Sequence, residues 1–514
     1  MLILVRVYQL KQECLLDIKS SHKKRKEFMR EARTRLAKLF RQTLPHESVV
    51  DQISSLRTYE CDGLSAYKQL PLLVVLPSSI EEVQSVIRIC QENSVPIVSR
   101  GAGTSLSGGA LPHADGIVLS LAKMNQLLEV DELNRTATVQ PGMRNLAISQ
   151  AVKSRGLYYA PDPSSQIACS IGGNVAENAG GVHCLKYGLT LHNIVNIKIV
   201  TVDGTLMTIG GSGQDSPGYD LLSLMIGSEG MLGVVVEVTV KLLPLPEVAK
   251  VVMGIFDSVE NAANSVAAII SSGIIPAGVE MMDNPAIRAA EAFVSANYPV
   301  DAEAILLCEL DGTDAEVEAQ ISKVETILRQ QGATDSKVAK DEAERALFWS
   351  GRKAAFPAVG RLSPDYYCID GTIPRRALGK VLTAISDLSK EYGLRVANVF
   401  HAGDGNLHPL ILYDASKPGE LEKTERLGGK ILELCIHAGG TITGEHGVGV
   451  EKIGEMCVQF SDQELEQFHA IKEVFDPQRI LNPGKAIPTL ARCAEHNAMH
   501  VHNGELPFPE LDRF

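Results

Sequence analysis

The apolar positions of the chain alternate between short runs and helically spaced segments. Residues 72–77 and 95–101 are rich in β-branched residues and predict strands. Between them, residues 79–93 place apolar side chains at every third or fourth position and predict a helix. Ser78 or Ser79 can cap this helix, because a serine hydroxyl accepts from the free N–H groups of a first turn. This strand–helix–strand order is typical of an α/β unit.

The pattern continues as one α+β region to about residue 247. Further strands are predicted at 116–121, 136–142, 194–204 and 233–244, with another helix at 145–157. Pro244 and Pro246 then interrupt the chain. Proline breaks both helices and central strands, so these two residues mark a domain boundary.

Beyond this boundary, strands alternate with long amphipathic helices. Strands are predicted at 251–256 and 304–310, and helices at 258–273, 314–332 and 462–477. This order favours an antiparallel sheet covered by helices, which we interpret as a cap domain. The expected fold class is therefore α+β, with the two regions forming separate domains.

We divide the chain into five segments. They are an N-terminal helical segment (1–58), a cofactor-binding domain (59–247), a cap or substrate domain (248–445), a C-terminal segment that returns to the cofactor-binding domain (446–490) and a tail (491–514). The basic residues 22–26 lead into helical spacing, so we expect a solvated helix face there. A partner or membrane contact is the alternative.

The net charge and the cysteine spacing argue against two classes of function, nucleic-acid binding and iron–sulfur cluster binding. The 514-residue chain is 45% hydrophobic with a formal net charge of -13, which argues against nucleic-acid binding because that requires clustered Lys and Arg. Ten scattered cysteines include no Cys-x-x-Cys pair, so we expect reduced thiols and no iron–sulfur cluster.

No apolar run approaches a membrane span of roughly 20 residues. We expect a cytoplasmic protein, with membrane association only through partner subunits as the alternative.

Four segments rich in glycine or small polar residues can bring backbone close to one long ligand. They are residues 100–109, 161–165, 170–181 and 227–233. Successive backbone N–H groups in the first segment can bind phosphate oxygens. It is not the Rossmann fingerprint, because Leu106 stands where the third glycine is required. This weakens an NAD-binding interpretation.

Two histidines and a glutamate suggest a metal site. His401 and His408 lie in the run Phe-His-Ala-Gly-Asp-Gly-Asn-Leu-His-Pro, and Glu445 lies in Gly-Glu-His-Gly-Val-Gly. Two imidazoles and one carboxylate suit one divalent ion, with Zn favoured and Mn or Fe(II) as alternatives, and leave positions open for substrate. Gly403 and Gly405 permit a tight bend between the imidazoles.

These motifs, in this order, resemble the FAD-binding vanillyl-alcohol oxidase family and its D-lactate and D-2-hydroxy acid dehydrogenase branch. The resemblance implies a two-subdomain FAD-binding domain of that type plus the α+β cap. It implies FAD contacts at Arg100, Gly101, Ala102, Gly103, Thr104, Ser105, Gly108, Pro161, Asp162, Ser164, Gly172, Gly173, Asn174, Asn178, Ala179, Gly180, Gly181, Glu229, Gly230, Gly233, Val234 and Asn482. Leu106 and Ser107 offer no nucleophile for a covalent flavin link. We therefore expect noncovalent FAD, with His183 and Cys184 as the residues that could contradict this.

The resemblance also implies oxidation of a 2-hydroxy acid. This reaction needs a base, a hydride acceptor and a cation for the carboxylate. We assign the base to His446, whose ordinary pKa lies near working pH, and the cation to Arg352, whose guanidinium can bind a carboxylate bidentately. The alternative for Arg352 is a surface salt bridge. Lys353 is expected to be solvated.

Substrate size and electron path follow from the same resemblance. Phe356, Cys368 and Leu410 stand where dicarboxylate-binding relatives are expected to carry polar groups. This favours a small 2-hydroxy monocarboxylate as substrate, either glycolate oxidised to glyoxylate or D-lactate oxidised to pyruvate.

Electrons must leave the chain, so the resemblance implies a second FAD-domain subunit and an iron–sulfur subunit, with this chain as the catalytic subunit. The tail is a candidate docking element. An oxygen-using FAD oxidase and a non-catalytic flavin-binding subunit remain as alternatives.

Overall fold

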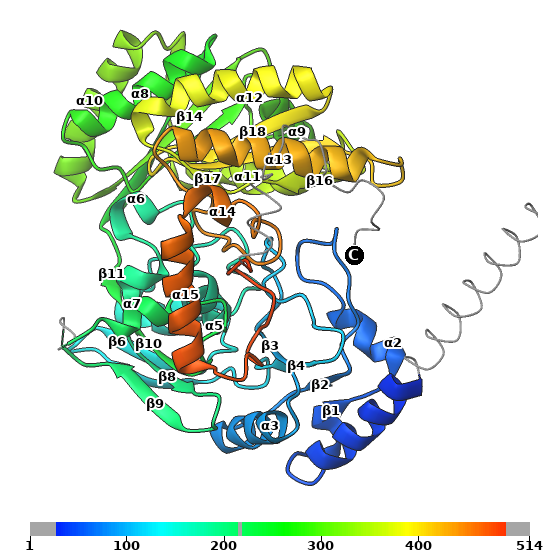
Figure 1. The fold of residues 1–514 in the computed structure, drawn as a ribbon. Helices are drawn as coiled ribbons and strands as arrows, with labels where there is room; N and C mark the ends of the chain where they lie inside the picture. Colours follow the sequence, from blue (N-terminus) through cyan, green and yellow to red (C-terminus); the bar gives the residue numbers. More distant parts are fainter. Residues whose placement is uncertain (1–26, 214–217, 490–514) are drawn as a thin grey trace, which may run out of the picture.

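The computed structural model describes residues 27–213 and 218–489, which form a lower body and an upper body (Figure 1). The first described element is a helix over residues 27–40. The labelled α-helices are α2 (Ile53–Leu56), α3 (Ile80–Glu92), α4 (Asn145–Val152), α5 (Ile171–Glu177), α6 (Cys184–Tyr187), α7 (Leu221–Met225), α8 (Val259–Ser271), α9 (Asn284–Val294), α10 (Asp314–Gln330), α11 (Glu342–Val359), α12 (Leu378–Tyr392), α13 (Glu420–His437), α14 (Met456–Gln459) and α15 (Asp462–Phe475).

Two sheets form the lower body. The first has the order β1 (Val49–Val50), β2 (Leu73–Val75), β4 (Ile117–Ser120) and β3 (Ile97–Arg100), and its last three strands are parallel. The second is antiparallel, in the order β5 (Leu127–Asp131), β6 (Thr136–Val139), β10 (Val234–Lys241), β8 (Ile194–Val200) and β9 (Leu206–Gly210). The small pair β7 (Leu157–Tyr158) and β11 (Leu243–Pro244) lies beside them.

Helix α3 connects β2 to β3 as the sequence predicts. Its N-cap is Ser79, whose hydroxyl accepts from the Glu82 N–H at 3.3 Å. Its apolar face, Val83, Val86 and Ile87, is buried in the same core as β2 and β3. Burial of this face joins the helix to the parallel sheet.

The upper body is built on an eight-stranded antiparallel sheet. Its order is β15 (Asp335–Val338), β12 (Val248–Phe256), β14 (Ala304–Gly312), β13 (Gly278–Asp283), β18 (Arg395–His401), β19 (Asn406–Tyr413) and β16 (Asp365–Cys368), with β17 (Gly371–Thr372) also paired to β19. Alternate residues of β12 enter two different cores, because successive side chains of a strand point to opposite faces. One core includes α8, α10, α12 and α13, and the other includes α9 and α11.

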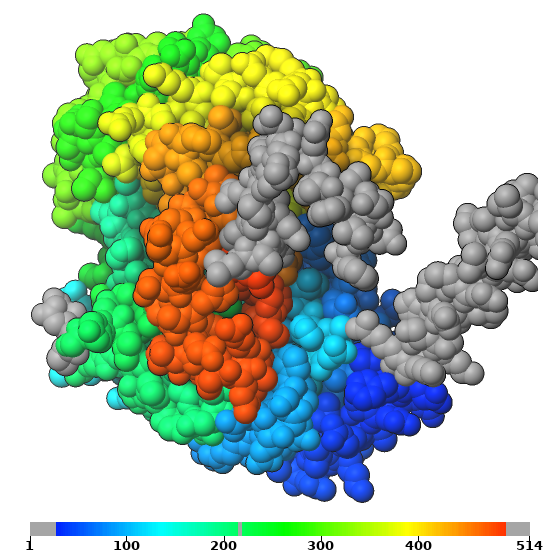
Figure 2. Space-filling view, in the orientation of Figure 1, coloured from blue at the N-terminus to red at the C-terminus, as the bar shows by residue number. Residues whose placement is uncertain are grey.

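The C-terminal segment returns from the upper body to the lower one. In Figure 2 the orange to red chain spans both bodies, and α15 runs along this path in Figure 1. The Ile97 N–H donates to Ile480 O, and the Asn482 N–H donates to Ile97 O, both at 2.7 Å. These bonds attach the segment to the edge strand β3.

Most strands and helices predicted from a clear apolar period are confirmed. The confirmed strands are β2, β3, β4, β6, β8, β10, β12 and β14, and the confirmed helices are α3, α4, α8, α10 and α15.

No described helix is long and apolar enough to cross a membrane. Seven described cysteines carry free thiols, whereas Cys457 is disulfide-bonded, so the expectation of reduced thiols fails at that residue. Basic residues 22–26 and tail 491–514 lie outside the described residues.

Candidate active site

A cavity of about 570 Å³ runs from the glycine-rich loops of the lower body to the histidines of the upper body. Many of the residues predicted to contact cofactor line it: Arg100, Gly101, Ala102, Gly103, Thr104, Ser105, Ser164, Gly172, Gly173, Asn174, Ala179, Glu229, Gly230 and Gly233. His408, Glu445 and His446 line the same cavity. The residues predicted to bind the cofactor and those predicted to act in catalysis and metal binding therefore line one cavity.

Other predicted cofactor residues lie outside the lining set. They are Gly108, Pro161, Asp162, Asn178, Gly180, Gly181, Val234 and Asn482. Asn482 has a supporting role, because its Nδ2 donates to Gly109 O at 3.0 Å and to Glu229 O at 2.7 Å. It thereby joins two of the predicted loops. A direct FAD contact for these eight residues stays a prediction.

The first loop fits a closely held ligand because its glycines leave no room for side chains. A Cβ at Gly101 would lie 2.0 Å from Ser170 Oγ, and one at Gly103 would lie 2.0 Å from Arg100 Nη2. Gly103 also has a φ of 71°, which favours glycine. Arg100 is in turn fixed by donating from Nη1 to Cys61 O at 2.7 Å. The loop is therefore tightly packed, and its binding of the phosphate groups of a dinucleotide stays a prediction.

A hairpin of β18 and β19 brings the two predicted imidazole ligands together. His401 is opposite Asn406, two residues before His408, so both imidazoles lie on one face of the hairpin. The turn between the strands requires Gly405, whose φ is 87°. The Asn406 N–H donates to Asp404 Oδ1 at 3.0 Å, so Asp404 braces this turn.

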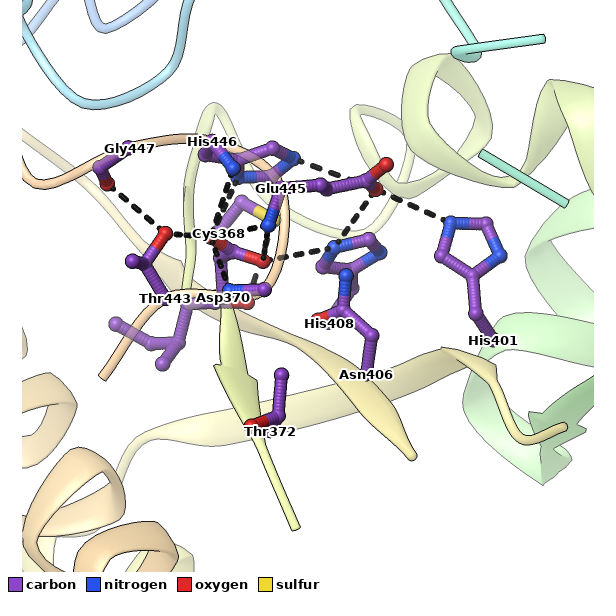
Figure 3. Close-up of polar contacts among 12 residues, drawn as sticks. Cys368, Asp370, Thr372, His401, Asn406, His408, Thr443, Glu445, His446 and Gly447 are labelled. Atoms are coloured by element: carbon purple, nitrogen blue, oxygen red, sulfur yellow. Dashed lines mark hydrogen bonds and ion pairs between the residues drawn. The ribbon is translucent and has the colours of Figure 1, made fainter. Parts of the chain in front are cut away.

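The three predicted metal ligands converge on one point (Figure 3). Nε2 of His401 and Nε2 of His408 each lie 3.2 Å from Glu445 Oε1. With metal–ligand bonds of about 2.1 Å, neighbouring ligand atoms of a tetrahedral site lie about 3.4 Å apart. Neither ring nitrogen of buried His408 has a hydrogen-bond partner of normal geometry among residues 27–213 and 218–489. The spacing and the unsatisfied nitrogens fit a divalent ion.

Glu280 orients His401 from the side away from Glu445. His401 Nδ1 lies 2.7 Å from Glu280 Oε1, and the two residues are directly opposite each other on β18 and β13. Carboxylates of this kind fix the orientation of a metal-binding imidazole. Although burial disfavours its charge, Glu280 and Glu445 raise the pKa of His401 well above its ordinary value. A divalent cation suits the same negative surroundings.

Arg352 pairs with Glu280. Its Nη2 lies 2.5 Å from Glu280 Oε2, and the side chain is 2% exposed. Arg352 therefore forms an ion pair, but a buried one and not the surface salt bridge given as the alternative. The contact is an ion pair without hydrogen-bond geometry, because Nε and Nη2 of Arg352 donate no hydrogen bond to any described residue. Arg352 does not line the cavity, whereas Lys353 does, so the clamp role of Arg352 stays a prediction.

His446 lies against the metal-ligand group, in surroundings that disfavour its charged form. Its ring stacks on His408 with centroids 4.8 Å apart, and its Nε2 lies 3.8 Å from Glu445 Oε1. Burial, assisted by His408, lowers the pKa of His446 to about 4 although Asp370 and Glu445 act in the opposite direction. Its buried Nδ1 has no hydrogen-bond partner among the described residues. A neutral imidazole with a free nitrogen can accept a proton.

Asp370 positions the turn that carries Glu445 and His446, and the sequence prediction missed it. Oδ2 of Asp370 accepts from the N–H groups of Gly444 at 3.1 Å and His446 at 2.9 Å, and Oδ1 accepts from Glu445 at 3.2 Å (Figure 3). Fully buried Lys452 donates from Nζ to Gly447 O at 2.7 Å and lies 3.6 Å from Asp370 Oδ2. The available signal was an acidic residue two positions after the strand 365–368.

His183 joins the two bodies and does not line the cavity. Its Nδ1 lies 2.8 Å from Asp162 Oδ2 and its Nε2 lies 3.1 Å from Glu309 Oε1 on β14. Burial opposes its charge, but the two carboxylates raise the pKa of His183 to about 10. Cys184 is also absent from the lining. Neither residue named above as a covalent flavin candidate reaches this cavity surface.

Aromatic rings close the cavity near His408. Phe356 lies edge-on to His408 with centroids 6.0 Å apart and to Tyr366 with centroids 6.3 Å apart, and both Phe356 and Tyr366 line the cavity. Cys368 and Leu410 are paired on β16 and β19 and lie outside the lining. Of the three positions used to infer substrate size, only Phe356 therefore faces this space.

Comparison with known proteins identifies the family. Residues 71–210 match the FAD binding domain family, and residues 245–486 match the family of FAD linked oxidases, C-terminal domain. The chain belongs to the FAD-linked oxidases and is an FAD-linked oxidoreductase. It is 62% identical to glycolate oxidase subunit GlcD of Escherichia coli K12 over 94% of this chain and 97% of the relative. This confirms the predicted branch.

Two more distant relatives and one solved structure are also similar to this chain. GlcD of Bacillus subtilis is 40% identical over 87% of this chain and 95% of its own length, and a D-lactate dehydrogenase of Anaerostipes hadrus is 33% identical over 87% and 96%. The solved structure of p-cresol methylhydroxylase covers 90% of this chain and 98% of that chain with a TM-score of 0.75 at 17% identity. This likeness supports the predicted fold of the vanillyl-alcohol oxidase type.

Proposed function

We propose that this protein oxidises a small 2-hydroxy monocarboxylate, converting glycolate to glyoxylate and also D-lactate to pyruvate. The observation that carries the proposal is the shared cavity, in which His408, Glu445 and His446 face the predicted FAD loops. The names of the relatives, glycolate oxidase subunit and D-lactate dehydrogenase, support the substrate class. The chemistry is removal of a hydroxyl proton and a hydride from the same carbon.

The residues divide this chemistry between them. His401, His408 and Glu445 would hold a divalent ion. When bound, the ion supplies a Lewis acid that acidifies the substrate hydroxyl, and FAD supplies the hydride acceptor. His446, neutral and with a free buried nitrogen, accepts the hydroxyl proton. Asp370 and Lys452 keep the turn of His446 in place.

Cations on α11 meet the substrate carboxylate in this proposal. A carboxylate can accept bidentately from the Nε and Nη2 edge of Arg352, and this edge makes no hydrogen bond within the described part of the chain. To reach substrate, Arg352 must exchange its contact with Glu280 for the substrate carboxylate. Lys353 is the neighbouring cation that already lines the cavity. Variants of the two residues separate their roles.

We propose Zn as the ion, with Mn or Fe(II) as the alternatives that accept the same two-imidazole, one-carboxylate ligand set. FAD binds noncovalently in this account, because His183 is held by Asp162 and Glu309 away from the cavity. Phe356 and Tyr366 limit the space beside His408, which supports a small substrate.

We propose further that the chain is the catalytic subunit of a complex with a second FAD-domain subunit and an iron–sulfur subunit. Neither candidate metal-ligand group among the described residues contains a cysteine, so the described part of the chain offers no cluster of its own. The relatives named as GlcD are subunits. Copurification from the native host, followed by iron analysis of the complex, tests this assignment.

Anaerobic mixing with a panel of 2-hydroxy acids tests the reaction. The flavin absorbance should bleach with glycolate and D-lactate and should persist with dicarboxylates. Persistence with every 2-hydroxy acid would contradict the proposal. A flavin that bleaches equally well after removal of the metal would favour an oxidase without a metal step, and full complex turnover with His446→Ala would favour a non-catalytic flavin subunit.

A further inference from the structure

A buried carboxylate connects the two bodies of the molecule. Glu309 lies on β14 of the upper body and is 4% exposed. Its Oε1 lies 3.1 Å from Nε2 of His183, the N-cap residue of α6 at the junction of the bodies (Figure 1). Its Oε2 accepts from Nη1 of Arg345 at 2.8 Å and from Nε1 of Trp349, both on α11. One side chain therefore contacts both the lower body and α11.

The lower-body side of this connection is fixed against the upper sheet. Oδ1 of Asp162 accepts from the His183 N–H at 3.2 Å, and Oδ2 of Asp162 lies 2.8 Å from Nδ1 of the same histidine. Val182 packs directly on the sheet, because a Cβ at Gly278 would lie 2.9 Å from Val182 O. Gly278 is directly opposite Glu309 in the pairing of β13 with β14. The loop that carries His183 is therefore held at the position of Glu309.

On the upper-body side, the connection continues along one face of α11 to the cavity. Arg345, Trp349 and Arg352 are spaced by four and three residues, so their side chains share this face. Arg352 pairs with Glu280 of β13 at 2.5 Å. Phe356, one turn farther along, lines the cavity. Because so short a length of helix moves as a unit, a shift of α11 at Trp349 would move the cavity wall at Phe356.

Asp311 provides a second contact between the bodies, two residues farther along β14. Its Oδ2 accepts from the Tyr187 hydroxyl at 2.5 Å, and its backbone oxygen accepts from Lys186 Nζ at 2.9 Å. Both donors lie on α6. Asp311 thus attaches α6 to the upper sheet independently of Glu309. Glu309 differs because it contacts α11 as well.

The surroundings of Glu309 favour its charged form. Although burial acts in the opposite direction, His183 and Arg345 lower the pKa of Glu309 below its ordinary value. Hydrogen bonds to charged groups are roughly twice as strong as those between neutral groups. A charged Glu309 therefore holds its partners on both bodies firmly.

The relative position of the two bodies matters for the proposed reaction. The lower body contains residues 71–210, which match the FAD binding domain family, whereas α11 of the upper body meets the substrate carboxylate in the proposal above. A misplacement of about 1 Å between reacting groups can lower a rate about 10²-fold. The contact that fixes α11 relative to the lower body can therefore control the rate without touching the substrate.

We propose that Glu309 is a positioning residue, which through His183 and α11 sets the distance between a substrate held by the upper body and FAD held by the lower body. This inference rests on the proposed function. It assigns no chemical step to Glu309.

Anaerobic stopped-flow mixing of the holoprotein with glycolate tests this role. Glu309→Gln keeps the size of the side chain but removes its charge, and His183→Gln breaks the contact between the bodies while leaving Glu309 on α11. Each should lower the limiting rate of flavin reduction, per bound FAD, at least about tenfold, with unchanged metal content. The double variant should be no slower than the slower single variant, because residues that act as a unit are not additive.

Asp283→Asn is the matched control. Asp283 is also buried, on the neighbouring strand β13, but its carboxylate accepts from Ala286 and Asn398 within the upper body. This variant should keep the original limiting rate. An unaltered limiting rate in Glu309→Gln or in His183→Gln, even with a lower unfolding midpoint, would overturn the proposal. An equal loss of rate in Asp283→Asn would also overturn it.

Trp349 provides a second readout that needs no substrate. It is the one tryptophan of the sequence and is 6% exposed. If His183 holds the bodies together at this point, His183→Gln should admit water and shift the Trp349 emission to longer wavelength, and Asp283→Asn should not. Unshifted emission in His183→Gln would contradict the inference. If no 2-hydroxy acid reduces the flavin of the unaltered protein, the proposed function is wrong, and the emission still decides whether His183 holds the bodies.

Discussion

The rings of His408 and His446 stack face to face, with centroids 4.8 Å apart and planes inclined by 3°. The first is a predicted metal ligand and the second is the proposed base. Their stacking places proton acceptance immediately beside the metal-ligand group. Because Glu445 precedes His446 in the chain, a displacement of their turn would disturb both the metal site and the base.

Replacing the proposed base should slow flavin reduction without changing FAD or metal binding. His446→Gln should lower the rate of flavin reduction by about 10²–10⁴-fold, the usual contribution of general base catalysis. FAD and metal contents should be unchanged, because His446 is not one of the three proposed ligands. His437→Gln, an exposed histidine of α13, is the control. A His446→Gln protein that reduces its flavin at the original rate would exclude His446 as the base.

Removing the support of His401 should weaken the metal site. Glu280→Gln cannot hold the His401 ring as a carboxylate does, and loss of such a partner typically lowers metal affinity about 10–100-fold. Competition with a chelator, followed by metal analysis, measures this change. Excess metal should restore much of the activity. Unaltered affinity in the variant would show that the Glu280 contact at 2.7 Å does not tune the ligand.

Variants of α11 should identify the carboxylate clamp. Arg352→Met should raise KM for glycolate at saturating metal by at least about tenfold, because a hydrogen bond to a charged group is worth about 1.5–3 kcal/mol. Lys353→Met provides the neighbouring comparison. If Arg352→Met changes only metal affinity, Arg352 acts through Glu280 and His401. A larger KM effect in Lys353→Met would assign the clamp to Lys353.

Asp370→Asn should damage the catalytic turn. An amide cannot accept from all the N–H groups that converge on Asp370, and it removes a carboxylate beside buried Lys452. Removing one member of a buried charged network typically costs about 3–5 kcal/mol. We expect a lower unfolding midpoint in urea together with weaker metal binding. Unaltered stability would contradict the anchoring role of Asp370.

His183 should make stability depend on pH. Its folded-state pKa is raised to about 10 from the ordinary value of 6.5, so the folded protein binds more protons than the unfolded chain between these values. Its contribution is complete below pH 6.5 and is lost as pH rises through about 10. His183→Gln should therefore show a shallower decline of unfolding free energy over this range. Equal slopes in both proteins would contradict a charged His183.

The sequence predicts the parts of the site that lie close together in the chain. His401 and His408 are separated by one glycine-containing bend, and the structure places both on one hairpin face. Glu280 could not be predicted in the same way, because it lies opposite His401 only through the pairing of β13 with β18. Periodicity defines a strand but not its partner 121 residues away.

Burial and ion pairing explain the remaining differences between the sequence predictions and the structure. Arg352 has the right chemistry for a clamp, but the sequence does not reveal that Glu280 already neutralises it. Asp370 gains its role from a turn that folds onto it from a distant segment. The glycine-rich loops were recognisable because their backbone, more than any side chain, forms the cradle.

Flavin reduction with and without the metal tests the central claim most directly. The purified holoprotein is mixed anaerobically with glycolate in a stopped-flow instrument, before and after removal of the divalent ion and again after its return. The account predicts rapid bleaching of FAD in the metal-loaded protein, a large loss of rate after removal and recovery on return. Equally rapid bleaching in the metal-free protein would contradict the proposed role of His401, His408 and Glu445.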